Sequence, residues 1–284
     1  MPDPQQKELE SSEIEAILGQ GITIPPQPRV LMEIEALSSL PRVNVKAIAR
    51  LISQDPALLA AMFKVVNSSA MGLAKRVDSA ETAITLLGLK PATNLLKSIA
   101  IRQLLGGNSQ AYEKFWERSG DIAQLAAIIA QKLVSVCNIF PDQAYMAGLF
   151  HDCGVPVLMQ RFPEYCKTLE SMSSYDWPEL AAEDKQFNTD HCVVGYLVGQ
   201  HWRLPEFILR GIRYHHEIIS VAQPAKTVVA ILQMSTHLYN LLVKSPHDSD
   251  WNACWQNCIY ELGISKDGLK EFEEAILEEF AQGR

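Results

Sequence analysis

Apolar residues recur at helical spacing along almost the whole chain, and this periodicity restricts the possible folds more than any other feature. The clearest example follows residue 110, where one face of a long predicted helix carries Ile122, Leu125, Ala126, Ile129, Leu133 and Val136. The alternation of apolar and polar residues that marks a half-buried strand is absent from the sequence. Even TVVAILQM, which is rich in β-branched residues, lies inside a longer helical pattern. The sequence therefore predicts an all-α protein.

Several predicted helices begin at residues suited to cap them. Asp55 followed by Pro56 is the strongest start signal, because the carboxylate can accept hydrogen bonds from free backbone amides and proline lacks only an amide that the first turn does not use. Asn44, and either Asp78 or Ser79, predict two further starts. These signals divide the first hundred residues into short helices.

Net charge and composition limit the classes of partner. The 284 residues carry a net charge of −8, and the pI is about 5.4. Because sequence-independent binding of nucleic acid needs a positive surface, we expect no nucleic-acid partner. No apolar run approaches the ~18 residues of a membrane span, and the N-terminus lacks a signal-peptide pattern, so we expect a cytoplasmic protein without a membrane partner. Cys254 and Cys258, four residues apart without a second ligand pair nearby, are interpreted as buried or half-buried thiols.

Four histidines and one aspartate form an ordered set that could bind a metal. His151 and Asp152 are adjacent within the apolar stretch AGLFHDCGVPVL, His191 follows, and His215 and His216 come next as a second adjacent pair. Imidazole and carboxylate ligands suit a divalent transition metal, which can activate water for phosphate-ester hydrolysis. The alternative is that these side chains are unconnected caps, core hydrogen-bonding groups or surface residues. The other histidines, which have no partner pattern, are interpreted as structural or exposed: His201, His237 and His247.

Pro156 predicts a helix break or kink beside the His151–Asp152 pair. If a helix continued past Gly154, Pro156 could not donate a hydrogen bond to the carbonyl of Asp152. We therefore expect this pair at the end of a helix.

The chain resembles the HDOD domains, a branch of the HD phosphohydrolase superfamily, over residues 22–262. The resemblance depends on the order of several blocks: IPPQPRVLMEIEALSS, DPALLAAMFKVVNSSAMG, VDSAETAITLLGLK, FWERSGDIAQLAAIIA, AGLFHDCGVPVL, DHCVVGYLVGQHWRLPE and YHHE. It implies a role in bacterial signal transduction and an N-terminal helical lobe packed on an HD-type helical bundle. With LGGNSQ at 105–110 as the boundary, the predicted domains are an N-terminal helix or extension (1–21), the N-terminal lobe (22–107), the HD-like lobe (108–262) and a C-terminal helix (263–284). A short acidic helix is expected at 7–18.

This chain departs from the pattern that the resemblance implies for catalytic members. Their first metal ligand is a histidine on the helix before the His-Asp pair, and alignment through FWERS places Arg118, or less well Ser119, at that position. A guanidinium cannot ligate a cation. The final aspartate ligand is missing too, since Thr236 or Ser235 falls in its place. In the related cyclic-dinucleotide hydrolases a lysine stands where this chain has Val155, and their Gly-Tyr-Pro motif is absent here.

Two functions follow from these departures. We favour a non-catalytic signalling module that binds a protein partner or a small-molecule signal, in which Arg118 forms a buried ion pair with Asp152 and no cofactor is required. The alternative is a metal-dependent phosphohydrolase with a reduced site, in which Arg118 clamps a phosphate and Asp152 takes part in catalysis. Its metal, Mn²⁺, Fe²⁺, Ni²⁺ or Mg²⁺, would take ligands from His151, Asp152, His191, His215 and His216.

Overall fold

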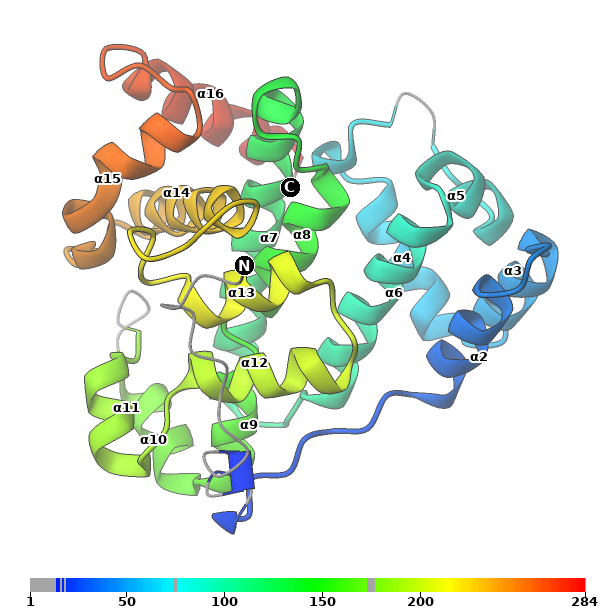
Figure 1. Ribbon diagram of the computed structural model, residues 1–284, viewed down its shortest axis with the longest axis horizontal. Coiled ribbons are helices and arrows are strands. Elements are labelled where there is room, and N and C mark those ends of the chain that lie inside the picture. The colour runs from blue at the N-terminus through cyan, green and yellow to red at the C-terminus, as the bar shows by residue number, and fades with distance from the viewer. Residues whose placement is uncertain (1–13, 16, 18, 74–75, 173–176, 284) are drawn as a thin grey trace.

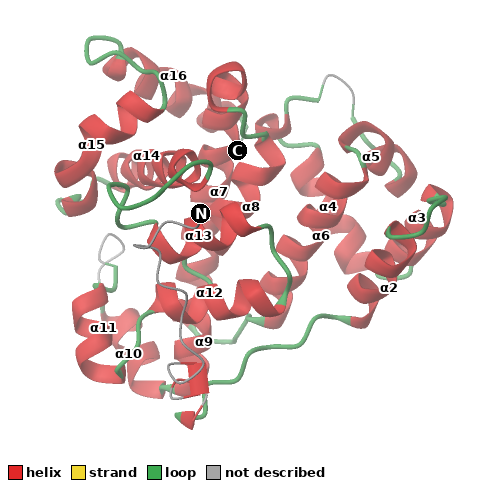
Figure 2. Ribbon diagram, viewed as in Figure 1, coloured by secondary structure: helices red, strands yellow, loops and turns green. Residues whose placement is uncertain are grey.

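Every regular element among the described residues is a helix, as the sequence predicts (Figure 1, Figure 2). The structure is a computed structural model, and it describes residues 14, 15, 17, 19–73, 76–172 and 177–283. Most of the helix expected at 7–18 lies outside these residues. The all-α fold class is therefore confirmed for the described part of the chain.

Helices α2 to α6, here called the N-terminal helices, begin where the sequence predicts caps. Asn44 accepts a hydrogen bond from the amide of Ala47 (3.1 Å), Asp55 from that of Leu58 (2.9 Å), and Ser79 from that of Thr82 (3.0 Å). The elements of this group are α2 (Arg29–Ser38), α3 (Val45–Ser53), α4 (Pro56–Val66), the short 3-10 helix η1 (Ser69–Met71), α5 (Ala80–Leu87) and α6 (Leu89–Leu104).

The remaining helices, here called the C-terminal helices, surround one long central helix. That helix, α7 (Gln110–Cys137), contacts α8, α10, α14 and α16 of its own group and η1 of the other (Figure 1). Buried apolar side chains from both groups form one continuous core. The other members are α8 (Pro141–Phe150), α9 (Gly154–Arg161), α10 (Pro163–Ser171), α11 (Leu180–Phe187), α12 (His191–His201), α13 (Glu206–Tyr214), α14 (Ala225–Val243), α15 (Ser249–Glu261) and α16 (Leu269–Gln282).

Helix α7 is the one helix of the described residues that is long and apolar enough to cross a membrane by length and composition alone. Half of its most apolar window is buried inside the protein. Its packing against five other elements explains this composition, because a central core helix needs apolar residues on several faces.

The helix break that Pro156 predicts is present. Helix α8 ends at Phe150, residues 151–153 form turns, and α9 begins at Gly154 with Pro156 in its first turn. A proline is tolerated there because the first amides of a helix have no partner within it. His151 and Asp152 thus lie between two helices, and both are buried.

Glycine at position 154 allows α9 and α12 to pack in close contact. A Cβ atom on Gly154 would lie 2.1 Å from the carbonyl oxygen of His191 and 2.8 Å from the amide nitrogen of Gly195, both on the backbone of α12. Backbone atoms cannot rotate away from such a contact, so any side chain here would push the two helices apart. This contact holds the first residue of α12, His191, close to the turn that carries Asp152.

We expect Gly154→Ala to lower the free energy of unfolding by about 1–3 kcal/mol, the usual range for overpacking a well-packed contact. Urea denaturation followed by circular dichroism measures the change. The matched control is Gly19→Ala, where an added Cβ would meet nothing within 4 Å. Equal stability of the two variants would contradict the close contact.

His237 links three C-terminal helices through two carboxylates. Its Nδ1 contacts Asp248 Oδ2 before α15 at 2.5 Å, and its Nε2 contacts Glu273 Oε1 on α16 at 3.1 Å. Burial opposes the charged imidazole, but the hydrogen bonds to Asp248 and Glu273 outweigh this and raise the pKa of His237. The interpretation of His237 as structural is confirmed, and His201 and His247 are exposed as expected.

Stability should depend on pH through His237. Since its pKa is higher in the folded protein than in the unfolded chain, its contribution is complete below about pH 6.5 and is lost as the pH rises through the folded-state pKa. The loss of unfolding free energy caused by His237→Gln should therefore be larger at pH 6 than at pH 9. Denaturation curves of both proteins at several pH values test this, with the exposed-residue variant His201→Gln as the control. A pH-independent difference for His237→Gln would rule out a charged imidazole at this position.

Candidate functional site

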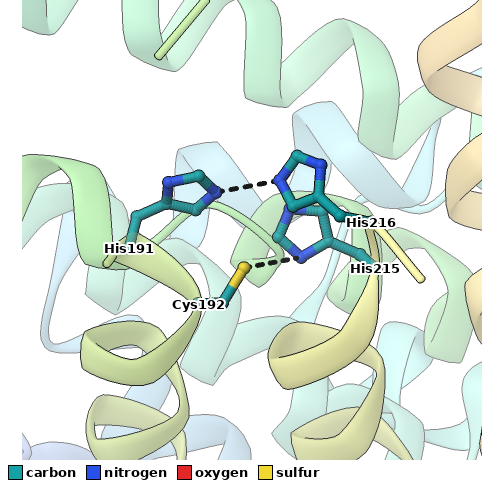
Figure 3. A group of neighbouring side chains, drawn as sticks. All are labelled: His191, Cys192, His215 and His216. Atoms are coloured by element: carbon teal, nitrogen blue, oxygen red, sulfur yellow. Dashed lines mark hydrogen bonds between the residues drawn. The ribbon is translucent and has the colours of Figure 1, made fainter. Parts of the chain in front are cut away.

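Asp152 lies at the centre of the four histidines that the sequence groups with it. His151 Nε2 is 2.9 Å from Asp152 Oδ2, while His215 Nε2 and His191 Nε2 are 3.1 and 3.4 Å from Asp152 Oδ1. His216 joins the cluster through its Nε2, 3.1 Å from that of His191. Helix ends produce this convergence. The His-Asp pair follows α8. His191 begins α12 and the His-His pair follows α13 (Figure 3).

All four imidazoles direct Nδ1 toward an oxygen acceptor and Nε2 toward the centre of the cluster. The Nδ1 partners are the carbonyls of Gly148 (2.7 Å, for His151) and Ile212 (2.8 Å, for His215), and the carboxylates of Glu183 (2.7 Å, for His191) and Asp250 (2.5 Å, for His216). An imidazole that donates its Nδ1 proton to such an acceptor keeps a lone pair on Nε2 when it is neutral. Metal-binding histidines commonly have this orientation, with the outer nitrogen fixed by an oxygen acceptor.

Two atoms at the centre of the cluster have no hydrogen-bond partner among the described residues. They are Asp152 Oδ1 and His215 Nε2, which are buried and face each other at 3.1 Å. Two acceptors at this distance repel each other unless a proton or a cation lies between them. The cluster therefore has the orphaned polar atoms expected at a cation site, and a protonated His215 is the other arrangement that would satisfy them.

The other carboxylate oxygen, Asp152 Oδ2, is paired with Arg118, as the sequence predicts. Arg118 Nη1 lies 2.8 Å from Asp152 Oδ2, and the side chains are 8% and 1% exposed. Trp177 donates from Nε1 to the same oxygen at 2.8 Å, and its ring lies 4.1 Å from the guanidinium carbon. The tryptophan thus holds both members of the pair, through a hydrogen bond and a cation–π contact.

Ionisation at the centre is set by the balance of burial and charge. Burial alone would raise the pKa of Asp152, but His151, His215 and Arg118 outweigh it and hold the pKa well below its usual value. Burial lowers the pKa of His151 despite the adjacent carboxylate. For His215, burial is outweighed by Cys192 and Asp152, which raise its pKa to about 10. A charged aspartate beside a neutral His151 is therefore the favoured state of the pair.

The space inside the cluster is small. A cavity of about 20 Å³ is lined by the ion pair, by imidazoles of the cluster and by Thr236 of α14. This volume holds about one water molecule or one ion. Thr236, and not Ser235, faces it: the Ser235 hydroxyl instead donates to the Ile231 carbonyl at 2.6 Å.

The residues can be grouped into two overlapping sets of metal ligands. One set is His151, Asp152 and His215, and the other is His191, Cys192, His215 and His216 (Figure 3). Cys192 Sγ lies 3.8 Å from His215 Nδ1, on the side of that ring away from Asp152. Imidazole, thiol and carboxylate ligands suit a divalent transition metal better than Mg²⁺, which prefers oxygen ligands.

Sequence reasoning missed four contributors to the site. Glu183 and Asp250 orient two of the imidazoles, Trp177 fixes the ion pair, and Cys192 adds a thiol. Cys192 follows His191 directly, and this adjacency was the one available signal. The other three come from α11, α15 and the segment before α11, and have no recognisable spacing to the histidines.

We expect Arg118→Met to lower the free energy of unfolding by about 3–5 kcal/mol, because methionine keeps most of the volume while Asp152 loses its buried counter-ion. Adding Asp152→Asn to the Arg118→Met variant should lower the free energy of unfolding by less than the same substitution does in the wild type. Urea denaturation of the four proteins in this cycle provides the test. The exposed pair Arg29–Glu33 supplies the control, since Arg29→Met should cost under about 1 kcal/mol. Similar losses for the two arginine variants would contradict a buried ion pair.

Comparison with known proteins gives one family. Residues 24–218 match the family model of the HDOD domain. An uncharacterized protein of Treponema pallidum is 28% identical over 208 residues, which are 73% of this chain and 40% of that protein. The chain thus spans about two fifths of the length of this relative.

Two solved structures have the same fold. An HDOD domain protein of unknown function from Geobacter sulfurreducens has a TM-score of 0.63 and 25% identity, with 94% of this chain and 97% of that chain covered. A protein from Shewanella amazonensis, named as a candidate metal-dependent phosphohydrolase, has a TM-score of 0.67 and 16% identity, with 95% and 96% covered.

Proposed function

This chain belongs to the HDOD domain family, and from that premise we propose that it is a regulatory signalling module that does not hydrolyse phosphate esters. The observation that carries the proposal is the buried pair between Arg118 and Asp152, at 2.8 Å. A guanidinium beside the carboxylate repels a cation at the position where catalytic HD-type proteins need their first metal ligand. The ion pair keeps the shape of the cluster and takes the place of its first ligand.

The size of the cavity supports the same proposal. A void of about 20 Å³ is far smaller than the ~300–1,000 Å³ of a typical ligand pocket. A phosphate ester cannot reach Asp152 unless the side chains around it move. The partner is then a protein or a small molecule bound elsewhere on the surface. With a net charge of −8, nucleic acid is not the expected partner.

A reduced phosphohydrolase is the second candidate, and the inward-facing Nε2 atoms favour it. Asp152, His191, and His215 or His216 would hold one divalent metal, with Mn²⁺, Fe²⁺ and Ni²⁺ better suited to these ligands than Mg²⁺. A metal bound there would supply an activated water for phosphate-ester hydrolysis. Glu183 and Asp250 would fix the orientation of the ligand imidazoles. Arg118 would have to leave Asp152 to clamp a phosphate.

Hydrolysis of bis(p-nitrophenyl) phosphate and of nucleoside monophosphates, assayed with Mn²⁺, Fe²⁺, Ni²⁺ or Mg²⁺, separates the two candidates. We expect no turnover above that of the Asp152→Ala variant prepared in the same way. Metal analysis of the protein as purified accompanies the assay. Turnover that depends on Asp152, together with near-stoichiometric metal, would establish the second candidate and overturn the first.

A further inference from the structure

A second, larger cavity lies between the N-terminal helices and the turn that joins α12 to α13. Its volume is about 1020 Å³, close to the upper end of the range for pockets that bind small molecules. Residues of α2 and α6 line one side, and the other side is lined by His201 at the end of α12 and by Arg203 and Pro205 of the α12–α13 turn. None of its lining residues belongs to the imidazole cluster.

Two buried polar side chains face this cavity. Asn94 is 6% exposed and lies in the lining. Lys97 is 5% exposed and bridges the two sides: its Nζ contacts Glu35 at 2.6 Å and donates to the carbonyls of Trp202 (3.1 Å) and Arg203 (3.3 Å). The Asn94 amide can both donate and accept hydrogen bonds, so it offers a ligand a polar contact in this lining.

The charges around the cavity favour an anion. Lys90, Lys97 and Arg203 line it with a single carboxylate among the described lining residues, Glu35, which is already paired with Lys97. This concentration of positive charge contrasts with the net charge of −8 for the whole chain. Cations gathered in a concave site attract anionic ligands and can form charge-assisted hydrogen bonds with phosphate.

The end of α12 and Lys97 together hold Arg203 beside the cavity. Arg203 has a φ of 52° and follows the C-cap of α12. The amide of Leu204 donates to the carbonyl of Gly199 at 3.0 Å, and the amide of Arg203 donates to that of Gln200 at 3.0 Å, which is the Schellman closure of a helix end. The carbonyl of Arg203 accepts from Lys97. The turn that carries this cationic residue is therefore fixed to α6.

Apolar groups complete the lining. Met32 is 57% exposed despite its apolar side chain, and Leu89, Pro26 and Pro205 also line the cavity. A flat, weakly polar ring could pack on this surface and hydrogen bond to the amide of Asn94, since asparagine amides pair well with the edges of bases. A ligand that combines such a ring with a phosphate fits both the apolar and the cationic parts of the lining.

We propose that this cavity binds a nucleoside phosphate, with the phosphate at Lys90 and Arg203 and the base against Met32 and Asn94. The inference deepens the proposed function, because it assigns the small-molecule signal of the regulatory module to a particular site. It does not depend on whether the imidazole cluster is catalytic. The α12–α13 turn connects the two sites: its helices carry His191 and the His215–His216 pair at their opposite ends.

Isothermal titration calorimetry of the full chain with AMP, GMP, CMP and UMP tests the proposal. Adenosine, which lacks the phosphate, and inorganic phosphate, which lacks the nucleoside, are titrated in parallel. The test variant is Lys90→Gln/Arg203→Gly, in which both residues are exposed and glycine suits the positive φ at position 203. The control is Lys64→Gln/Lys185→Gln, which removes two exposed cations that do not line the cavity.

We expect at least one nucleotide to bind, with an affinity about tenfold or more lower in the test variant and unchanged in the control. Adenosine and phosphate alone should bind at least about tenfold more weakly than the nucleotide. Amide exchange should slow on binding in residues 89–97 and 199–206. No binding by any of the four nucleotides, equal binding by the test variant, equal binding of phosphate alone, or protection confined to other segments would overturn the inference. A lack of nucleotide binding would not change the result of the hydrolysis assay. The proposed ligand site and the proposed non-catalytic function can therefore be contradicted separately.

Discussion

Burial of the Asp152 carboxylate is the constraint on which the rest of this structure depends. An ionised carboxylate that is 1% exposed is stable only if charges and hydrogen bonds replace its water. One oxygen has two donors, Arg118 and Trp177, whereas the other faces the Nε2 atoms of His191 and His215 and has no donor among the described residues. This asymmetry explains why two readings of the site are chemically reasonable. One oxygen is satisfied as in a structural ion pair, and the other is arranged as in a metal centre.

The helices are placed so that their ends, and not their faces, build this environment. Each imidazole of the cluster lies at a helix terminus, where the backbone can turn and two adjacent residues can both point inward. The close contact between α9 and α12 at Gly154 holds the two principal termini together. Because the cluster joins residues from several helices, its geometry depends on the packing of the whole group of C-terminal helices.

Local features of the sequence predicted local structure well. The caps at Asn44, Asp55 and Ser79, the break before Pro156 and the long helix after residue 110 depend on interactions within a few residues, and all of them are present. The Arg118–Asp152 pair was predicted from the position of Arg118 in the family pattern. Glu183, Asp250, Trp177 and the cavity beside Lys97 could not be predicted, because each depends on how distant helices pack. The division of the chain into domains remains a prediction.

Helices α12 and α13 connect the two cavities. Helix α12 has 11 residues, so the turn at 201–205 lies about 16 Å from His191, and α13 returns over a similar distance to His215. Lys97 fastens this turn to α6, and the indole of Trp202 fastens it to the carbonyl of Pro25 at 2.9 Å. Helices transmit displacement along their axes with little bending, so a ligand that moved the turn would also move both imidazole-bearing ends. Such a movement would change the distances from the Nε2 atoms of His191 and His215 to the unsatisfied oxygen of Asp152. Helices α12 and α13 therefore offer the proposed signalling module a physical route by which a ligand at one cavity affects the other.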